Sequence, residues 1–486
     1  VDYPREAVLK SYEDAHLSGD IVVTAPLERV GRASRTTLVN RLTDHSETGR
    51  ENALERVREC AKAHPSADSI RTAARERTEI EVPKSTPRRH LLRTDRRVLD
   101  LLEAPTGARI AAPEFDTFYA NSGGYGYTWF REDAAAARHL LTAAESLGLD
   151  ETETLTASAR FYCETQRSDG TWPHRVWASD GSLAPGWANA MVESDDHSKE
   201  YQADQTATVA TFLATLLRTR RESVPDGLAE AVRETIADAV DALDATRADD
   251  GLPRACQNRW EDMEGRFTHT AATYLHAYAA VARAPVDDDL AARALDGADA
   301  VFEGLDHLYD PDRGVWALRL EEGVQDVRLD ASTFALVDAF TAYDAVADLP
   351  ASALDRLVSH AEVSLDGLYR DPAGDVAGVI RYEEDRWRSG EQDSEKVWAV
   401  PTGLAAVGAA RLGALLNDRG RQGDRFLDRA GSLYELLDED GPFATDVGYL
   451  SEQVFDDGTH DSGTPIGRGH ALRMATTGLL AERDAL

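Results

Sequence analysis

The chain has 486 residues, of which 42% are hydrophobic, and its formal net charge is −34. Nucleic acids and anionic membrane surfaces bind Lys and Arg side chains, so neither is an expected partner of so acidic a chain. No unbroken apolar run approaches the 18 residues that a membrane span needs, and the length suffices for a large buried core. We therefore expect a soluble, globular protein.

The basic residues are almost all arginine, and short acidic runs such as "VDDD" and "DDGTHD" recur along the chain. Salt screens the repulsion between such charges, so this composition favours a salty working environment. Dense surface carboxylates with few lysines resemble proteins of salt-loving archaea. This expectation concerns the surface and not the reaction.

Residues 1–87 are polar and weakly patterned. Within them "GDIVVTAPL" predicts a strand and "ENALERVRECAKAH" a helix, so we expect a small mixed N-terminal extension. The segment lacks the charged-then-apolar layout of a signal peptide, which favours a cytoplasmic protein. Because the chain begins with Val rather than Met, a secreted protein that has lost a leader is the alternative. Three widely spaced cysteines without metal-ligand spacing are expected to be reduced structural thiols: Cys60, Cys163 and Cys256.

From about residue 88 onward, apolar residues recur every three or four positions, which predicts roughly a dozen amphipathic helices. Short connections such as "GLDE", "RESVPD" and "ADLP" alternate with long ones near residues 167–200, 247–266, 305–329, 370–399 and 439–467. Helices joined by a short turn run antiparallel, so strict alternation brings every long connection to one end of the molecule. The pattern predicts an all-α (α/α)6 toroid barrel of helix hairpins over residues 88–486. An open solenoid would need repeated sequence units, and we find none.

Most tryptophans fall in or beside the predicted long connections, with Trp129 just before a helix that starts near Arg131. The others are Trp172, Trp177, Trp187, Trp260, Trp316, Trp387 and Trp398. Any single one of them is more often a residue that packs beneath a loop. Aromatic faces gathered with polar partners at one end of a rigid scaffold suit a sugar pocket, so for the whole set we expect a pocket.

Two glutamates in the long connections are candidates for catalysis. Glu261 in "RWED" and Glu452 in "GYLSEQVFDDG" each come shortly before a predicted helix. Hydrolysis of a glycosidic bond needs one protonated carboxyl for the leaving oxygen and one carboxylate that activates water or attacks directly. Trp260 is an apolar neighbour that would raise the pKa of Glu261 and keep it protonated. Carboxyls on different helix pairs favour the wider separation, roughly 6.5–9.5 Å, of inverting enzymes.

Ordered motifs over about residues 97–480 resemble glycoside hydrolase family 15, which contains glucoamylases, glucodextranases and archaeal trehalases. Each motif is weak alone, but their order and spacing together are specific. In chain order they are "TGARIAAPEFD", "YGYTWFREDAA", "QRSDGTWPHRV", "YQADQTATVATFLATLL", "NRWEDMEGRFTHTAA", "VIRYEEDRW" and "YLSEQVFDDGTHDSGTPIGRGHAL". The fifth is similar to the segment that bears the family's general acid, and the last to the segment that bears its general base.

The resemblance implies that Glu261 is the acid and that Glu452 is the base that deprotonates water. It implies that Arg131 and its acidic neighbour bind hydroxyls of the non-reducing-end sugar, and that Arg381 binds other hydroxyls of the same ring. Four further residues are expected to contact substrate or line its pocket, the first two on the leaving-group side: Trp260, Asp262, Trp129 and Trp398.

The chain departs from the family pattern at three places. The family usually has Asp directly after the Arg of the "YGYTWFREDAA" motif, whereas here Glu132 intervenes before Asp133, and either side chain is a candidate for the sugar site. Where the family tends to have Trp-Ser-His-Ala after the base, this chain has the four residues 468–471, "RGHA". Relatives often carry an N-terminal β-sandwich, for which fewer than ninety residues are present.

We therefore expect an inverting, exo-acting glycosidase that releases glucose from the non-reducing ends of α-linked oligosaccharides, with no cofactor and no metal. The oligomeric state stays open. A trehalase of the same family is the nearest alternative, followed by a carbohydrate-binding relative without turnover and by a phosphorolytic enzyme. "GGYGY" (Gly123 to Tyr127) lacks the Lys-Ser/Thr of a phosphate-binding loop and is expected to be a turn that presents Tyr125 and Trp129. His269 and His470 lack spaced metal-binding partners, and "DDGTHD" does not match a calcium loop.

Overall fold

The computed structural model describes residues 82–83, 86–113, 124–184, 202–372, 376–387 and 389–486. Most of the expected N-terminal extension therefore lies outside the described residues, and its boundary stays a prediction. The described residues form twelve α-helices: α7 (Arg89–Leu102), α8 (Phe130–Leu147), α9 (Thr152–Thr165), α10 (Asp204–Thr219), α11 (Asp226–Thr246), α12 (Thr268–Ala282), α13 (Asp288–Gly304), α14 (Ala335–Asp344), α15 (Ala351–Gly367), α16 (Ala399–Asp418), α17 (Asp424–Leu436) and α18 (Gly467–Ala481).

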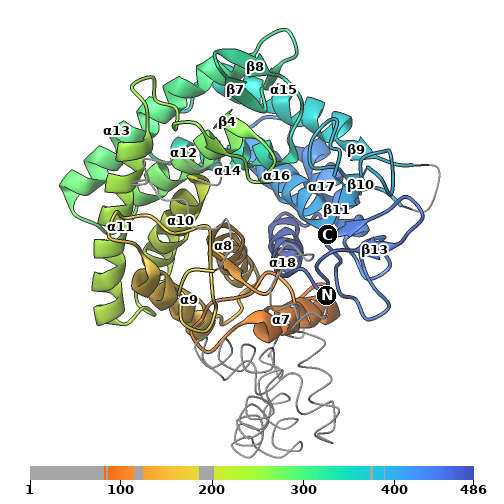
Figure 1. Cartoon of the computed structure of the whole chain (residues 1–486), viewed down its shortest axis with the longest axis horizontal. Helices are drawn as coiled ribbons and strands as arrows, with labels where there is room; N and C mark the ends of the chain where they lie inside the picture. The colour runs from red at the N-terminus through yellow and green to blue at the C-terminus, as the bar shows by residue number, and fades with distance from the viewer. Residues whose placement is uncertain (1–81, 84–85, 114–123, 185–201, 373–375, 388) are drawn as a thin grey trace, which may run out of the picture.

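The helices form a closed double ring (Figure 1). α8, α10, α12, α14, α16 and α18 contact one another in this order, and α18 returns to contact α8. α9, α11, α13, α15 and α17 each follow an inner helix after a short turn and lie outside the ring, while α7 packs on α18. The (α/α)6 toroid predicted from the alternation of short and long connections is confirmed.

Inner and outer helices differ in how much of their surface is apolar. The outer helix α11 buries Leu228, Val232 and Ile236 along one side and has charged residues on its opposite side, as expected for a helix with one solvent-exposed face. The inner helix α16 is buried on nearly all sides and is long and apolar enough to cross a membrane by length and composition, but 89% of its most apolar window is buried inside the barrel. Glycine lets α16 approach α18, since a Cβ at Gly403 would lie 2.8 Å from Cβ of Leu472.

The long connections carry short antiparallel strands that tie neighbouring connections together. β1 pairs with β2, β5 with β6, and two larger sheets have the orders β3-β4-β7-β8 and β13-β12-β11-β10-β9. The strands are β1 (Thr128–Trp129), β2 (Arg175–Val176), β3 (Cys256–Gln257), β4 (Glu264–Phe267), β5 (Tyr309–Asp310), β6 (Val315–Trp316), β7 (Arg319–Glu321), β8 (Val324–Asp326), β9 (Tyr369–Arg370), β10 (Gly378–Val379), β11 (Val397–Trp398), β12 (Gln453–Val454) and β13 (His460–Asp461). Two 3-10 turns, η1 (Leu305–Leu308) and η2 (Ala331–Phe334), lie in the α13–α14 connection.

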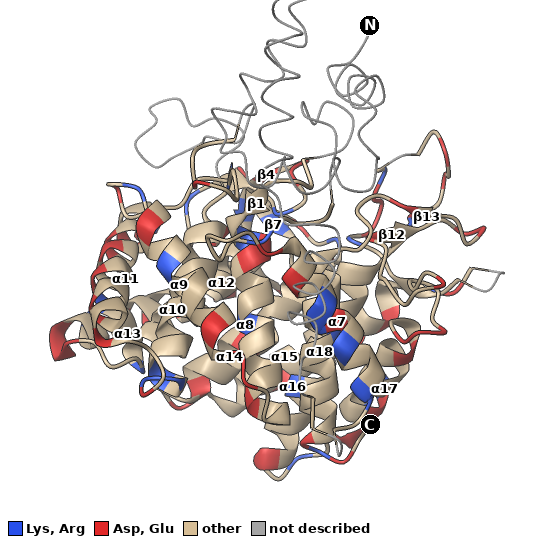
Figure 2. Ribbon diagram, turned by 90° about the horizontal axis from the view of Figure 1, so that it is seen from below, with Lys and Arg blue, Asp and Glu red and all other residues tan. Residues whose placement is uncertain are grey.

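The described parts of the long connections lie at one end of the barrel (Figure 2). Each of them precedes an inner helix, so the inner helices all begin at this end. Helix N-termini carry partial positive charge, and six of them therefore point toward the same end of the barrel axis. A polar site at this end is built from loops, on a rigid helical scaffold.

Candidate active site

Glu261 occupies the tight turn between β3 and β4. Asn258 shapes the turn, because its side-chain oxygen accepts hydrogen bonds from the backbone N–H groups of Asp262, at 3.0 Å, and Met263, at 3.1 Å. Glu261 has a φ of 65°, in the left-handed region that non-glycine residues rarely adopt. Such conformations cost about 1–3 kcal/mol and cluster at functional sites. The turn thus holds the Glu261 carboxylate in a fixed position with about a quarter of the side chain exposed.

The Glu261 carboxylate is bound by two cationic or potentially cationic groups. Arg131 Nη2 donates to Glu261 Oε1 at 2.9 Å, and His174 Nε2 lies 3.5 Å from the same oxygen. Burial raises the pKa of Glu261, but the His174 hydrogen bond and the charge of Arg131 outweigh it, and the pKa lies below its usual value. The expectation that Trp260 would raise the pKa of Glu261 and keep it protonated is therefore wrong. The Trp260 indole instead donates to Asp330 Oδ1 at 3.0 Å.

Glu452 lies directly before β12, in the α17–α18 connection. Its backbone is fixed on both sides, since its N–H donates to Gly463 and its carbonyl accepts from Ala399 at the start of α16. The Tyr125 hydroxyl donates to Glu452 Oε2. Burial, together with the charge of Glu132, raises the pKa of Glu452 to about 7, against the opposing effect of the Tyr125 hydrogen bond and Arg381.

The two carboxylates act on one shared region. Burial and the charges of both Glu452 and Glu261 raise the pKa of Tyr125 well above its usual value. Glu261 precedes α12 and Glu452 precedes α18, and these two helices are three steps apart in the ring of six, so they stand opposite each other. The carboxylates therefore belong to opposite walls of a single site.

Glu132, rather than Asp133, belongs to the group of charges at this site. Three guanidinium groups converge on Glu132 Oε1, from Arg468 at 2.8 Å, Arg131 at 3.1 Å and Arg259 at 3.2 Å. Burial alone would raise the pKa of Glu132, but these charges, with Arg468 first, lower it to about 2.

Asp133, one residue later on α8, lies in a different environment. It is buried against Arg109, whose Nη1 lies 3.0 Å from its carboxylate. Successive helix residues point about 100° apart, and here Asp133 points toward Arg109 whereas Glu132 points toward the arginines. The geometry removes Asp133 from the candidate sugar site.

Arg381 stacks among aromatic rings on the same end of the barrel. Asp385 holds its guanidinium through two hydrogen bonds of 2.7 Å. The guanidinium carbon lies 4.7 Å from the ring centre of Trp398 and 5.6 Å from those of Trp260 and Trp387. Trp387 is about half exposed, whereas Trp398 is buried. These rings and the fixed guanidinium offer both a stacking surface and hydrogen-bond donors.

Asp262 lies beside this aromatic group. The hydroxyl of Tyr382 donates to Asp262 Oδ2 at 2.5 Å, and Arg381 Nη2 lies 3.8 Å from the same oxygen. Asn258 donates to the other carboxylate oxygen at 2.8 Å. Asp262 thus joins the Glu261 turn to the Arg381 group.

The other tryptophans divide between the site and the core. Trp172 and Trp316 are buried core residues whose indole N–H groups donate to backbone carbonyls. Trp177 packs edge-on against Tyr127. Trp129 is also buried and packs edge-on against the His174 ring at 4.8 Å. Trp187 lies outside the described residues. Trp260, Trp387 and Trp398 thus gather at Arg381, and an aromatic sugar pocket stays a prediction.

Four residues that bind the carboxylates were not assigned a role from the sequence: His174, Tyr125, Arg259 and Arg468. His174 and Tyr125 fall inside segments that matched the family pattern or a turn, but nothing in their spacing singles them out. Arg468 replaces the family's Trp, which was a visible signal. Within the described ranges, no cluster of three or more His, Cys, Asp or Glu side chains is arranged to hold a metal ion.

Comparisons with known proteins match most of the chain to one family. Residues 88–467 match the family described as Glycosyl hydrolases family 15, and residues 1–53 match a domain of unknown function, DUF7997. No curated protein sequence matches significantly.

Solved structures match at the level of fold. A structure titled "Glycosidase Wild Type" is 19% identical, with 82% of this chain and 97% of that chain covered and a TM-score of 0.56. A glucoamylase from Saccharomycopsis fibuligera is 14% identical, with coverages of 86% and 96% and a TM-score of 0.58. A bacterial glucoamylase complexed with acarbose is 15% identical, with coverages of 93% and 62% and a TM-score of 0.55.

Proposed function

Because the chain belongs to glycosyl hydrolases family 15 and is a glycoside hydrolase, we propose that it is an inverting, exo-acting enzyme that releases glucose from the non-reducing ends of α-linked oligosaccharides. The observation that carries this proposal is the pair Glu261 and Glu452 on opposite walls of one site. Opposite walls suit a wide separation with room for a water molecule. A bacterial glucoamylase of similar fold forms a complex with acarbose, which supports a carbohydrate as the ligand.

In the proposed reaction, Glu261 donates a proton to the glycosidic oxygen as the bond to the anomeric carbon breaks. Glu452 accepts a proton from the water that attacks this carbon from the opposite side, which inverts its configuration. The leaving group departs with a hydroxyl, and the released sugar carries the oxygen of water. Arg131 and Glu132 would bind hydroxyls of the terminal sugar, and Arg381 would bind others.

The protonation state of the free site bears on this mechanism. At mildly acidic pH the pair holds one proton, and it lies mainly on Glu452, because Arg131 and His174 favour the ionised form of Glu261. The reaction needs that proton on Glu261. Sugar hydroxyls that take over the Arg131 donors would raise the pKa of Glu261, so substrate binding itself would favour the productive arrangement.

The variants Glu452→Gln and Glu261→Gln test the roles. Each should lower kcat on maltotriose by roughly 10²–10⁴-fold, while calorimetry still detects binding of the sugar. Proton NMR of the first product should show β-glucose, and retention of the α-anomer would contradict inversion. Full activity in either variant would remove that glutamate from the proposal.

The same assay with other substrates separates the alternatives. Glucose from trehalose but none from maltotriose would favour a trehalase. Arg468 stands where the family tends to have Trp, and it contacts Glu132 of the proposed sugar site. Binding without any product would indicate a carbohydrate-binding relative. A rate that rises with added phosphate would indicate phosphorolysis.

We also propose that the surface is adapted to salt. The net charge of −34 supports this proposal, and acidic residues are frequent along the outer helices (Figure 2).

A further inference from the structure

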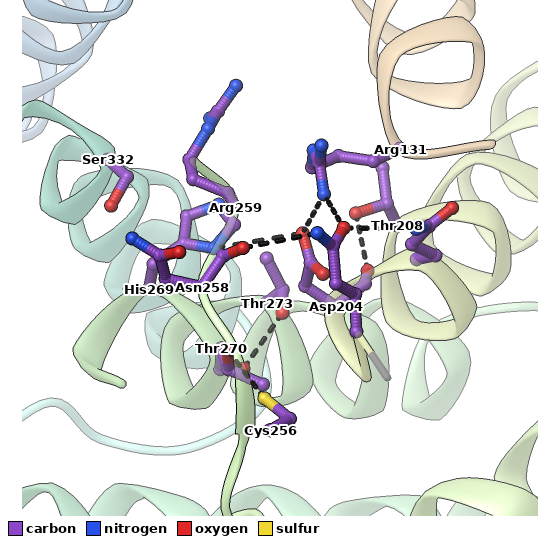
Figure 3. Close-up of polar contacts among 12 residues, drawn as sticks. Arg131, Asp204, Thr208, Cys256, Asn258, Arg259, His269, Thr270, Thr273 and Ser332 are labelled. Carbon is purple, nitrogen blue, oxygen red and sulfur yellow. Dashed lines mark hydrogen bonds and ion pairs between the residues drawn. The ribbon is translucent and has the colours of Figure 1, made fainter. Parts of the chain in front are cut away.

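A cavity of about 50 Å³ lies on the barrel axis among the first turns of the inner helices. Its lining includes Arg259 and Arg468 at the end nearer the site, His269 on α12, and Arg138 and Asp338 farther along the axis. Figure 3 shows that Arg131 and Asp204 pair with each other, whereas the Arg259 side chain extends away from them. The polar groups around this cavity are not balanced in charge.

Two arginines at the site end of the cavity share one carboxylate. Arg131 has its own anionic partners, Glu261 at 2.9 Å and Asp204 at 3.7 Å. Glu132 then remains for both Arg259 and Arg468, which contact the same oxygen. These three arginines therefore face three carboxylates in all, so the charges balance in number, but two of the carboxylates lie on the Arg131 side.

The same arrangement recurs farther along the axis. Arg138 Nη1 lies 2.6 Å from Asp338 and Arg411 Nε lies 3.1 Å from it, so again two guanidinium groups share one carboxylate. The two groups together hold five arginines and four carboxylates, so one positive charge is in excess along the axis of a chain with a net charge of −34. The N-termini of the inner helices add to this potential, because they point toward the site end of the axis.

The ionisable groups respond to this potential. Burial and the nearby charge of Arg468 lower the pKa of Arg259 to about 9. Burial, followed by the charges of Arg259, Arg131 and Arg468, lowers the pKa of His269 well below its usual value. Both shifts oppose positive charge at the cavity, as expected where a counter-anion is needed.

Unused hydrogen-bond donors face the same space. Arg259 Nε and Nη1, and Arg468 Nε, are buried without a hydrogen-bond partner among the described residues. Both side chains are more than nine-tenths buried. The hydroxyls of Thr208 and Thr211 donate to their own helix backbone and do not compete for an acceptor in the cavity.

We propose that this cavity is a binding site for a small monovalent anion of the halide type, such as chloride, held by the free N–H groups of Arg259 and Arg468. The volume has room for a halide with one or two waters, since a single water needs about 10–15 Å³. Water alone would satisfy the donors but would leave the excess charge. The proposed ligands are Arg259 and Arg468 and neither catalytic candidate, so the proposal does not depend on the identity of the sugar substrate. Arg131, which binds Glu261, also lines the cavity.

Crystals of the full chain soaked in sodium bromide test the position directly. Anomalous scattering at the bromine edge should show a peak between Arg259 and Arg468. In solution, the Tm in sodium chloride should exceed that in sodium gluconate at equal ionic strength, with a saturable rise of about 2–5 °C.

The variant Arg468→Gln should lose the difference between the two salts. The matched control Arg483→Gln removes an arginine from the exposed pair with Asp418 and should retain it. An empty cavity in the bromide data, equal Tm values in both salts, or a bromide peak without saturable stabilisation would each overturn the proposal. Stabilisation by phosphate or sulfate but not by halide would also overturn it, because the site would then suit a larger anion.

Discussion

Arg131 Nη2 donates to Oε1 of Glu261 across 2.9 Å, and the same guanidinium donates through Nε to Glu132. One arginine thereby connects the candidate acid to the carboxylate that would bind the terminal sugar. A ligand that changes the Arg131 contacts changes the pKa of Glu261. Binding and proton transfer are coupled through this side chain, and the pH dependence of the reaction should report on it.

The first prediction concerns the two limbs of the pH profile and the effect of His174 on the acidic one. Activity requires one proton in the Glu261–Glu452 pair. The value of kcat/KM should therefore fall above about pH 7, where both carboxylates are ionised. It should also fall below the lowered pKa of Glu261, where both carboxylates are protonated. In His174→Phe the hydrogen bond that lowers the pKa of Glu261 is lost, so the acidic limb should move to higher pH. A stopped assay of kcat/KM across about pH 3–9 measures both limbs.

The exposed His90 provides the control for that shift. His90→Gln should leave both limbs where they are. If His174→Phe moved the alkaline limb and left the acidic one, Glu261 would not be the group that titrates at low pH.

The second prediction concerns Tyr125. Its hydroxyl donates to Glu452, and this bond favours the ionised carboxylate. In Tyr125→Phe the pKa of Glu452 should rise above about 7 and the alkaline limb should follow it to higher pH. Loss of a hydrogen bond to a charged group is worth about 1.5–3 kcal/mol, so kcat should fall by roughly 10–100-fold. An unchanged alkaline limb would mean that Glu452 does not set it.

The fold could be predicted because its evidence is distributed over the whole chain. The short turns predicted at "GLDE", "RESVPD" and "ADLP" all join an inner helix to an outer one, and the long connections all precede inner helices. In contrast, the direction in which a single side chain points from a helix depends on the residue at which that helix begins. α8 begins at Phe130, and this start puts Glu132 with the arginines and turns Asp133 toward Arg109. Two adjacent acidic residues in a sequence contain no such information.

The pKa of Glu261 could not be predicted for a related reason. Trp260 is its neighbour in sequence, but Arg131 and His174 come from other connections and are 130 and 87 positions away. Charges brought together by the fold outweigh the sequence neighbour, because Coulomb interactions depend on distance in space.

The third prediction concerns the buried group behind the Glu452 segment. Asp95, His470 and Arg473 are fully buried, with His470 Nδ1 at 2.6 Å and Arg473 Nη2 at 2.5 Å from Asp95 Oδ1. His470 Nε2 accepts the backbone N–H of Leu450, two residues before Glu452. Asp95→Asn would leave Arg473 buried without a counter-charge and should lower the free energy of unfolding by about 3–5 kcal/mol. Denaturant unfolding followed by fluorescence measures this loss.

The exposed pair of Asp418 and Arg483 is the matched control for this group. Asp418→Asn should change the free energy of unfolding by less than about 1 kcal/mol. Equal effects of the two variants would show that the buried group contributes no more than a surface ion pair.

The fourth prediction concerns salt. Repulsion within a chain of net charge −34 is screened as ionic strength rises, so Tm should increase with sodium gluconate concentration. Gluconate is used because it is too large for the axial cavity, and the effect then reports on surface charge. A Tm that stays constant from about 0.05 to 1 M salt would contradict a salt-adapted surface.

The last prediction separates Glu132 from Asp133. Glu132 accepts hydrogen bonds from three arginines on the side that faces the proposed sugar. Glu132→Gln should therefore lower kcat/KM by roughly 10–100-fold. This matches the loss of about 1.5–3 kcal/mol for a hydrogen bond to a charged group. Asp133 is paired with Arg109 away from the site, so Asp133→Asn should lower the free energy of unfolding and leave KM unchanged. Steady-state kinetics and denaturant unfolding on both variants provide the comparison. A large rise in KM for Asp133→Asn, with a normal value for Glu132→Gln, would reverse the assignment, because the family's single aspartate would then correspond to the second of the two acidic residues.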